Sequence, residues 1–157
     1  MRVRAATPDG VIEAELSGRT DVRFSFRPGY YERCTERDLE RRLAGIAAVL
    51  WARRTRAYRE ALSEAFEQPI TGEDPPSGPR DLHYREMRDE LVARGRSADG
   101  RIAASVRGMR DWDVRILDGT IRALDERAFR TAAAEVAGEL IRDQFAQIAR
   151  LKNMVYG

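Results

Sequence analysis

The sequence has very little of the residue types that most enzyme and metal sites use. Its 157 residues include one cysteine, Cys34, one histidine, His83, and one lysine, Lys152. A single cysteine excludes an intrachain disulfide and fits a reducing compartment, and one thiol with one imidazole is a poor ligand set for zinc. Because Cys34 and His83 lie far apart in the sequence, no local signature of a nucleophile pair is present. We therefore expect no catalytic residue, no metal site and no cofactor.

Long apolar runs are also absent. No segment approaches the roughly 20 apolar residues of a membrane-spanning helix, and the basic N-terminal segment has no apolar signal-peptide core. No glycine-rich nucleotide-binding motif occurs. With 43% hydrophobic and 34% charged residues, the composition is typical of a soluble globular chain. We expect a cytoplasmic protein that makes no membrane contact and is not an enzyme.

Arginine supplies almost all of the positive charge. Of 28 lysine and arginine residues all but Lys152 are arginine, and with 26 acidic residues the net charge is +2. This balance permits an anionic partner without requiring one. Each arginine offers a planar, bidentate donor that suits phosphate and carboxylate groups.

An internal repeat organises the chain. When the sequence is shifted by 90 positions, residues 9–50 align with residues 99–140 without a gap, and 12 of 42 positions are identical. About four identities would be expected by chance from this composition. The alternative is a chance similarity of two amphipathic segments. We interpret the two segments as copies of one small unit.

The residue pattern of each copy predicts two strands followed by a long helix. Alternating apolar and polar residues joined by a glycine turn predict strands over residues 11–16 and 22–27 in the first copy and 102–107 and 112–116 in the second. Additional edge-strand candidates are Val3 with Ala5, and residues 92–97. Thr35 and Asp125 are N-cap residue types, and helical periodicity continues from them to about Phe66 and Met154.

A proline-rich linker separates the copies. Residues 68–79 contain four prolines and two glycines, which cannot continue a helix. After it, an amphipathic helix is predicted from about Asp81 to Ala93, so only the second copy has a leading helix. The predicted organisation is unit 1 over residues 1–67, the linker, and unit 2 over residues 80–157. We expect the two sheet halves to pair or pack together, with long helices covering one face and projecting beyond it.

The densest cluster of cations lies in the first long helix. The segment from Trp51 to Glu60 holds four arginines and one glutamate, with Tyr58 among them. Such a helix face can bind phosphates and stack bases, or it can be a solvated face whose aromatic residues are buried. The candidate DNA-binding residues are Arg53, Arg54, Arg56 and Arg59, with Arg41, Arg42, Arg142, Arg150 and Lys152 as secondary candidates.

One known family has a similar arrangement of motifs. The pattern Asp-Gly, alternating strand, Gly-x-x-Asp-Val-x-Phe-x-x-x-Pro, then Thr-Glu-Arg-Asp-Leu and an Ala/Arg-rich helix resembles the YbaB/EbfC nucleoid-associated proteins, especially their divergent actinobacterial relatives. The resemblance covers roughly residues 3–66 and, more faintly, 80–152. It implies α+β units with small antiparallel sheets and an intertwined dimer whose projecting helices hold DNA like a tweezer. Here two such units would be fused into an internal pseudo-dimer.

Two functions follow from these observations as hypotheses. The first is non-specific binding of duplex DNA through arginine–phosphate contacts, in a cytoplasmic, nucleoid-associated protein. The second is a protein-interaction module, such as an accessory of type VII secretion, that has lost DNA binding and contacts a protein partner or a second copy. This second hypothesis follows from two differences from the family: copy one lacks the leading helix, and copy two lacks the arginine cluster.

Overall fold

The two halves of the chain have the same fold. The computed structural model describes residues 1–157, and the first half contains β1 (Arg2–Ala6), β2 (Ile12–Ser17), β3 (Asp21–Phe26), α1 (Tyr30–Arg33) and α2 (Glu36–Phe66). The second half contains α3 (Pro79–Glu90), β4 (Val92–Arg96), β5 (Ile102–Arg107), β6 (Asp111–Ile116), α4 (Thr120–Ala123) and α5 (Glu126–Tyr156). Apart from α3, each element of the second half begins 90 residues after its counterpart, as Glu126 does after Glu36. The predicted repeat is confirmed.

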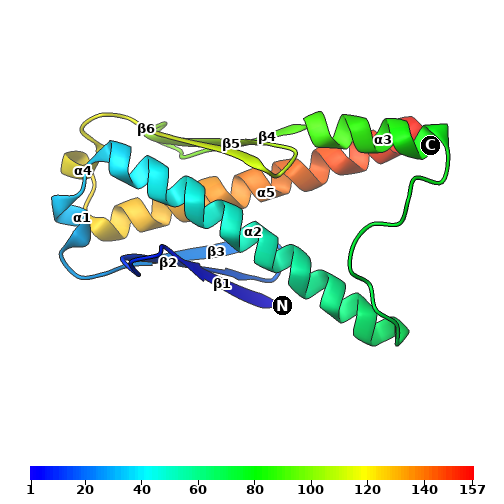
Figure 1. Cartoon of the computed structure of the whole chain (residues 1–157). Helices are drawn as coiled ribbons and strands as arrows, with labels where there is room; N and C mark the ends of the chain where they lie inside the picture. The colour runs from blue at the N-terminus through cyan, green and yellow to red at the C-terminus, as the bar shows by residue number, and fades with distance from the viewer.

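The two long helices lie between two sheets (Figure 1). The strand orders are β1-β2-β3 and β4-β5-β6, both antiparallel, and no strand of one sheet pairs with the other. Helix α2 packs against β1 and β2 of its own unit and against β6 of the other, whereas α5 packs against β4, β5 and β3. Because the two helices exchange roles in this way, the units are related by an approximate twofold axis. The chain is an α+β internal pseudo-dimer.

This arrangement corrects several of the expectations. The sheets neither pair nor pack on each other, because the apolar stripes of both helices fill the space between them. Each unit has three strands, since the candidate edge strands form β1 and β4. The leading helix ends at Glu90 and not at Ala93, because Val92 and Ala93 pair with β5. The single-turn helices α1 and α4 were not expected from the pattern.

The two N-cap residues act as the sequence predicts. Thr35 accepts a hydrogen bond from the backbone N–H of Asp38 at 3.1 Å, and Asp125 accepts one from Ala128 at 2.8 Å. These bonds satisfy N–H groups of the first helical turn, which have no partner within the helix. Asp9 and Asp99 each accept a bond from the backbone N–H two residues further on. Both carboxylates are therefore turn residues.

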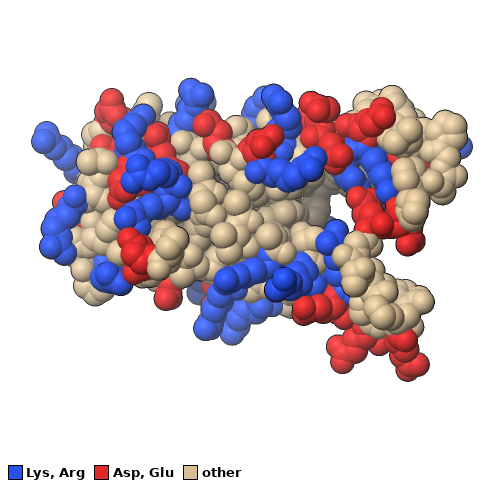
Figure 2. Space-filling model, viewed as in Figure 1, with Lys and Arg blue, Asp and Glu red and all other residues tan.

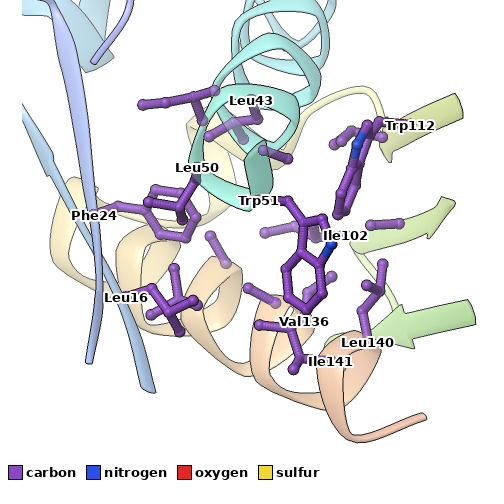
Figure 3. Close-up of a pocket in the computed structure, with 17 residues that line it drawn as sticks. Leu16, Phe24, Leu43, Leu50, Trp51, Ile102, Trp112, Val136, Leu140 and Ile141 are labelled. Carbon is purple, nitrogen blue, oxygen red and sulfur yellow. The ribbon is translucent and has the colours of Figure 1, made fainter. Parts of the chain in front are cut away.

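One apolar core joins the two units. It contains 18 buried side chains, among them Ile12 and Leu43 from the first unit and Ile102 and Phe129 from the second. At its centre, seventeen apolar residues from both sheets and both long helices surround a cavity of about 80 Å³ (Figure 3). The predicted boundaries at residues 67 and 80 therefore separate two repeats that share a single core.

Beyond the sheets, the chain forms two diverging arms (Figure 1). One arm is the C-terminal half of α2, and the other is the C-terminal half of α5 with α3 packed on it. In the second arm the rings of Tyr84 and Tyr156 lie 5.6 Å apart, and the Tyr156 hydroxyl donates to Asp81 at 2.9 Å. Residues 67–78 connect the two arms. None of the helices combines the length and the hydrophobicity of a membrane span.

The contact between β4 and α5 predicts that Gly95 cannot be replaced. A Cβ at Gly95 would lie 2.2 Å from the carbonyl oxygen of Val136 and 2.9 Å from the backbone nitrogen of Leu140. We expect Gly95→Ala to lower the free energy of unfolding by about 1–3 kcal/mol, since strand and helix must separate. Urea denaturation followed by circular dichroism measures the change.

Gly45→Ala is the matched control. No atom lies within 4 Å of a Cβ at this exposed position of α2, so alanine should raise the free energy of unfolding by about 0.5–1 kcal/mol. An unchanged midpoint for Gly95→Ala would contradict the close packing of β4 on α5.

Candidate nucleic-acid interface

The middle of α2 lies against the start of β1. The Arg53 guanidinium donates to the carbonyl oxygen of Arg4 at 2.7 Å, and the side chains of Arg53 and Arg56 are exposed. On β1, Arg2 and Arg4 both pair with the carboxylate of Glu15, each at 3.0 Å. Two cations therefore share one carboxylate beside two further exposed cations.

The turn between β2 and β3 brings another arginine to the same end of the sheet. The backbone N–H of Gly18 donates to the carbonyl oxygen of Met1 at 3.0 Å, so the turn lies beside the start of β1. Arg19 extends from this turn and places its guanidinium carbon 4.6 Å from the ring centre of Phe145 on α5. Such a distance is that of a cation–π contact.

Arg54 differs from its neighbours on α2. Its guanidinium carbon lies 4.6 Å from the ring centre of Trp51 and 5.4 Å from that of Phe145. Its Nε is buried and has no hydrogen-bond partner. Burial, followed by repulsion from Arg19, lowers the pKa of the Arg54 guanidinium. A helix rotates about 100° per residue, so Arg54 turns toward α5 whereas Arg53 turns toward β1.

Arg142 lies on α5 beside the β2–β3 turn. Its Nη1 and the carbonyl oxygen of Thr20 each lie 3.2 Å from the point where a Cβ on Gly138 would stand. The side chain therefore lies along α5 beside the β2–β3 turn. No carboxylate forms an ion pair with Arg19, Arg54 or Arg142.

These side chains form one surface, which we call the basic patch. It consists of Arg2, Arg4, Arg19, Arg53, Arg54, Arg56 and Arg142. Glu15 is the one carboxylate that pairs with any of them. Figure 2 shows positive side chains gathered along the lower edge of the molecule, over β1 and the middle of α2. The sequence pattern identified four of the seven residues and missed Arg2, Arg4 and Arg19, which lie in the N-terminal strand and a turn.

Five of the predicted residues lie outside the basic patch. Arg41 and Arg42 are held by carboxylates, Arg41 by Asp38 at 2.6 Å and Arg42 by Asp9 at 2.7 Å. Arg59 lines the cleft between the arms. Arg150 and Lys152 are exposed further along α5, in the arm that carries α3, and neither forms an ion pair. The remaining predicted residues, Arg53, Arg54, Arg56 and Arg142, are brought together.

A second set of cations lies on the outer face of the other sheet. Arg94, Arg96 and Arg107 are exposed and form no ion pair with a carboxylate. In the central strand, Ala103 and Ser105 occupy the positions that Glu13 and Glu15 occupy in the first sheet. The signal for this set was present in the repeat alignment, where two acidic residues of copy one have neutral counterparts in copy two.

The α2 arm does not have the charge that a DNA tweezer requires. After Arg59, helix α2 contains Glu60 and Glu64, the next residue after the helix is Glu67, and no lysine or arginine follows in this arm. All three glutamates are exposed, and Figure 2 shows negative charge at this tip. Phosphates between the tips would be repelled by this arm. The surface suited to phosphate is the basic patch at the base of the arm.

Other reactive groups are not assembled into a site. No group of three or more His, Cys, Asp or Glu side chains is placed to hold a metal ion. His83 is exposed on α3. Cys34 donates its thiol hydrogen to the carbonyl oxygen of Tyr31 at 3.2 Å, and burial raises the pKa of this thiol to about 11. The thiol is therefore protonated at neutral pH and is a weak nucleophile.

The ion pair between Asp9 and Arg42 predicts a loss of stability in acid. Hydrogen bonds from Arg42 and then Thr7 lower the pKa of Asp9 from 3.8 to about 2. Because this pKa is lower in the folded than in the unfolded state, the contribution of Asp9 is complete above about pH 4 and is lost as the pH falls toward 2. We expect Asp9→Asn to flatten this part of the stability curve, as measured by urea denaturation at several pH values. Asp74→Asn in the linker is the control, and a curve for Asp9→Asn with the wild-type slope would contradict the role of the pair.

No protein-family model, curated protein or solved structure matches this chain. The resemblance to the YbaB/EbfC proteins therefore stays a prediction from the sequence motifs.

Proposed function

We propose that the protein binds duplex DNA without sequence preference, through contacts from the basic patch to backbone phosphates. The observation that carries this proposal is the convergence of seven arginines from β1, the β2–β3 turn, α2 and α5, with Glu15 as their one paired carboxylate. Like charges repel, so the fold holds these cations together at a cost in stability. Phosphates relieve that repulsion, and binding releases the counterions condensed on the duplex.

The position of α2 favours contacts to the backbone over contacts to bases. The helix packs against strands of both sheets, so that part of its surface is covered. The strip that contains Arg53 and Arg56 remains exposed to solvent. A helix that is covered in this way does not enter the major groove, where base sequence is read. Phosphate contacts position a protein on DNA and carry no sequence information of their own.

The resemblance to nucleoid-associated proteins supports the same function. It implies duplex binding by a dimer of α+β units, and this chain is an internal pseudo-dimer of such units. The proposal differs in the location of the contacts, which lie at the base of the α2 arm and not at its acidic tip. A nucleoid-associated protein acts in the bacterial cytoplasm, and we propose that location for this chain.

The double substitution Arg53→Gln/Arg56→Gln tests the proposal. If each arginine contacts one phosphate, the slope of log K against log salt should fall by about 2, which corresponds to about fiftyfold weaker binding in 0.1 M salt. Both side chains are exposed, so the fold should be retained. Fluorescence anisotropy with a mixed-sequence duplex between about 50 mM and 200 mM salt measures the effect.

Arg94→Gln/Arg96→Gln is the matched control, because it removes the same charge from the outer face of the other sheet. It should change duplex affinity little. Equal weakening by both double substitutions would mean that net charge and not the basic patch determines binding. Absence of duplex binding by the wild type at about 50 mM salt would refute the function.

A second candidate function is favoured by the cleft between the arms. This cleft has a volume of about 960 Å³, and its apolar lining includes Trp51, Tyr58, Leu62, Ile70, Met109 and Trp112. Side chains with large exposed apolar surfaces occur on both arms, among them Tyr58 at 51% and Phe66 at 63% on α2 and Met154 at 63% on α5. The acidic tip of α2 would suit an amphipathic helix with basic ends. We propose such a helix of a protein partner, as in a secretion accessory, as the alternative.

A synthetic amphipathic helix with lysine-rich ends tests this alternative. Wild-type protein should bind it, and Tyr58→Ser should weaken that binding by about tenfold or more, since Tyr58 lines the cleft and aromatic anchors dominate such interfaces. Val49→Ser, which removes a partly exposed apolar side chain on α2 that does not line the cleft, should have no effect. Equal affinity for all three proteins would exclude the cleft as the binding site.

A further inference from the structure

Two arginines of the basic patch share one aromatic ring. The guanidinium carbons of Arg19 and Arg54 lie 4.6 Å and 5.4 Å from the centre of Phe145, and Arg54 also lies 4.6 Å from the centre of Trp51. The two aromatic rings are 6.5 Å apart. A guanidinium held against an aromatic ring keeps N–H groups that can still donate. The aromatic side chains thus hold two arginines close to one ring.

A small residue on α5 leaves the space that the Arg142 guanidinium occupies. Gly138 lies one turn before it on α5 and has no side chain where the Arg142 guanidinium lies. The same space borders the carbonyl oxygen of Thr20, the residue after Arg19. Arg142 therefore lies beside the turn that carries Arg19, while Arg19 and Arg54 both lie against the ring of Phe145.

Nothing within the protein neutralises these charges. None of the three arginines pairs with a carboxylate, and the buried Nε of Arg54 has no acceptor. Burial and the nearby Arg19 lower the pKa of Arg54, which agrees with a cation that lacks a counter-charge. Buried charges in proteins are normally paired.

The repeat shows that the fold does not need these cations. On the opposite side of the pseudo-dimer, across the approximate twofold axis, the counterparts of Arg19, Arg54 and Arg142 are Met109, Gln144 and Ala52, and the counterpart of Phe145 is Thr55. The elements on that side are the same, and these three cations are missing from it. The arginines therefore belong to a feature of one side of the pseudo-dimer.

We propose that Arg19, Arg54 and Arg142 form an oxyanion site that binds a phosphate group. A phosphate has at least two free acceptor oxygens, and it carries a charge of −1 in a nucleic-acid backbone and near −2 in a monoester, which suits bidentate guanidinium donors. The phosphate comes either from a small phosphorylated molecule or from a nucleic-acid backbone. In the second case the inference rests on the proposed function.

Titration with inorganic phosphate at constant ionic strength tests the site. Wild-type protein should bind phosphate with saturation in calorimetry, and the ¹⁵N–H signal of the Arg54 Nε should shift as the site fills. Two substitutions, Arg54→Gln and Arg19→Met, each introduce the residue type found at the counterpart position of the repeat. Each should weaken phosphate binding by about tenfold or more. Arg19 is exposed in a turn, so Arg19→Met should retain the fold even if the other variant does not.

Arg94→Gln is the control and should leave phosphate affinity unchanged. Absence of saturation in the wild type, unchanged affinity in Arg19→Met, or equal weakening by Arg94→Gln would overturn the site. Duplex binding by the same variants identifies the source of the phosphate. Loss of both ligands in Arg19→Met assigns the site to a DNA phosphate, and loss of inorganic phosphate alone assigns it to a small molecule. Saturable phosphate binding in a protein that does not bind duplex would refute the proposed function and support this site.

Discussion

The structure depends on two helices that are each shared between two sheets. Helix α2 contacts strands of both units, as does α5, so neither three-stranded sheet has a complete apolar core of its own. Small sheets of this size bury too little surface to be stable alone. The two repeats must therefore fold as one body, which is why residues from both halves surround the central cavity (Figure 3). Hydrogen bonds reinforce the association, since Glu36 and Glu40 at the start of α2 accept from backbone N–H groups of the second unit.

Within this symmetric framework the surfaces have diverged. The first unit brings Arg19 and Arg54 to its side of the molecule, whereas the second has Met109 and Gln144 at the same positions. The core positions of the repeat keep their apolar character, because both halves fill the same interior. Surface positions lack that constraint, and a duplicated unit can acquire a charged site on one side without loss of the fold. We infer that the functional information of this chain lies in the differences between its repeats.

Much of the fold could be predicted because its signals are local. The alternation of residues, the glycine turns and the caps Thr35 and Asp125 identified β2, β3, β5, β6 and both long helices. The placement of the helices between the sheets could not be predicted, because the stripe that includes Leu39 and Leu43 is compatible with packing on one sheet or on two. The basic patch was predicted in part. Arg53 and Arg56 belong to a visible cluster, whereas Arg19 lies alone in a turn, and only folding brings it to Phe145.

We propose above all that one side of a twofold-related molecule carries the phosphate-binding surface. Backbone amide chemical shifts of ¹⁵N-labelled protein, followed while a mixed-sequence duplex is added at low salt, test it most directly. The account predicts that shifts concentrate in β1, the β2–β3 turn and the middle of α2, with little change in β4, β5 and β6. Equal shifts in both repeats, or shifts confined to the tips of the arms, would contradict it.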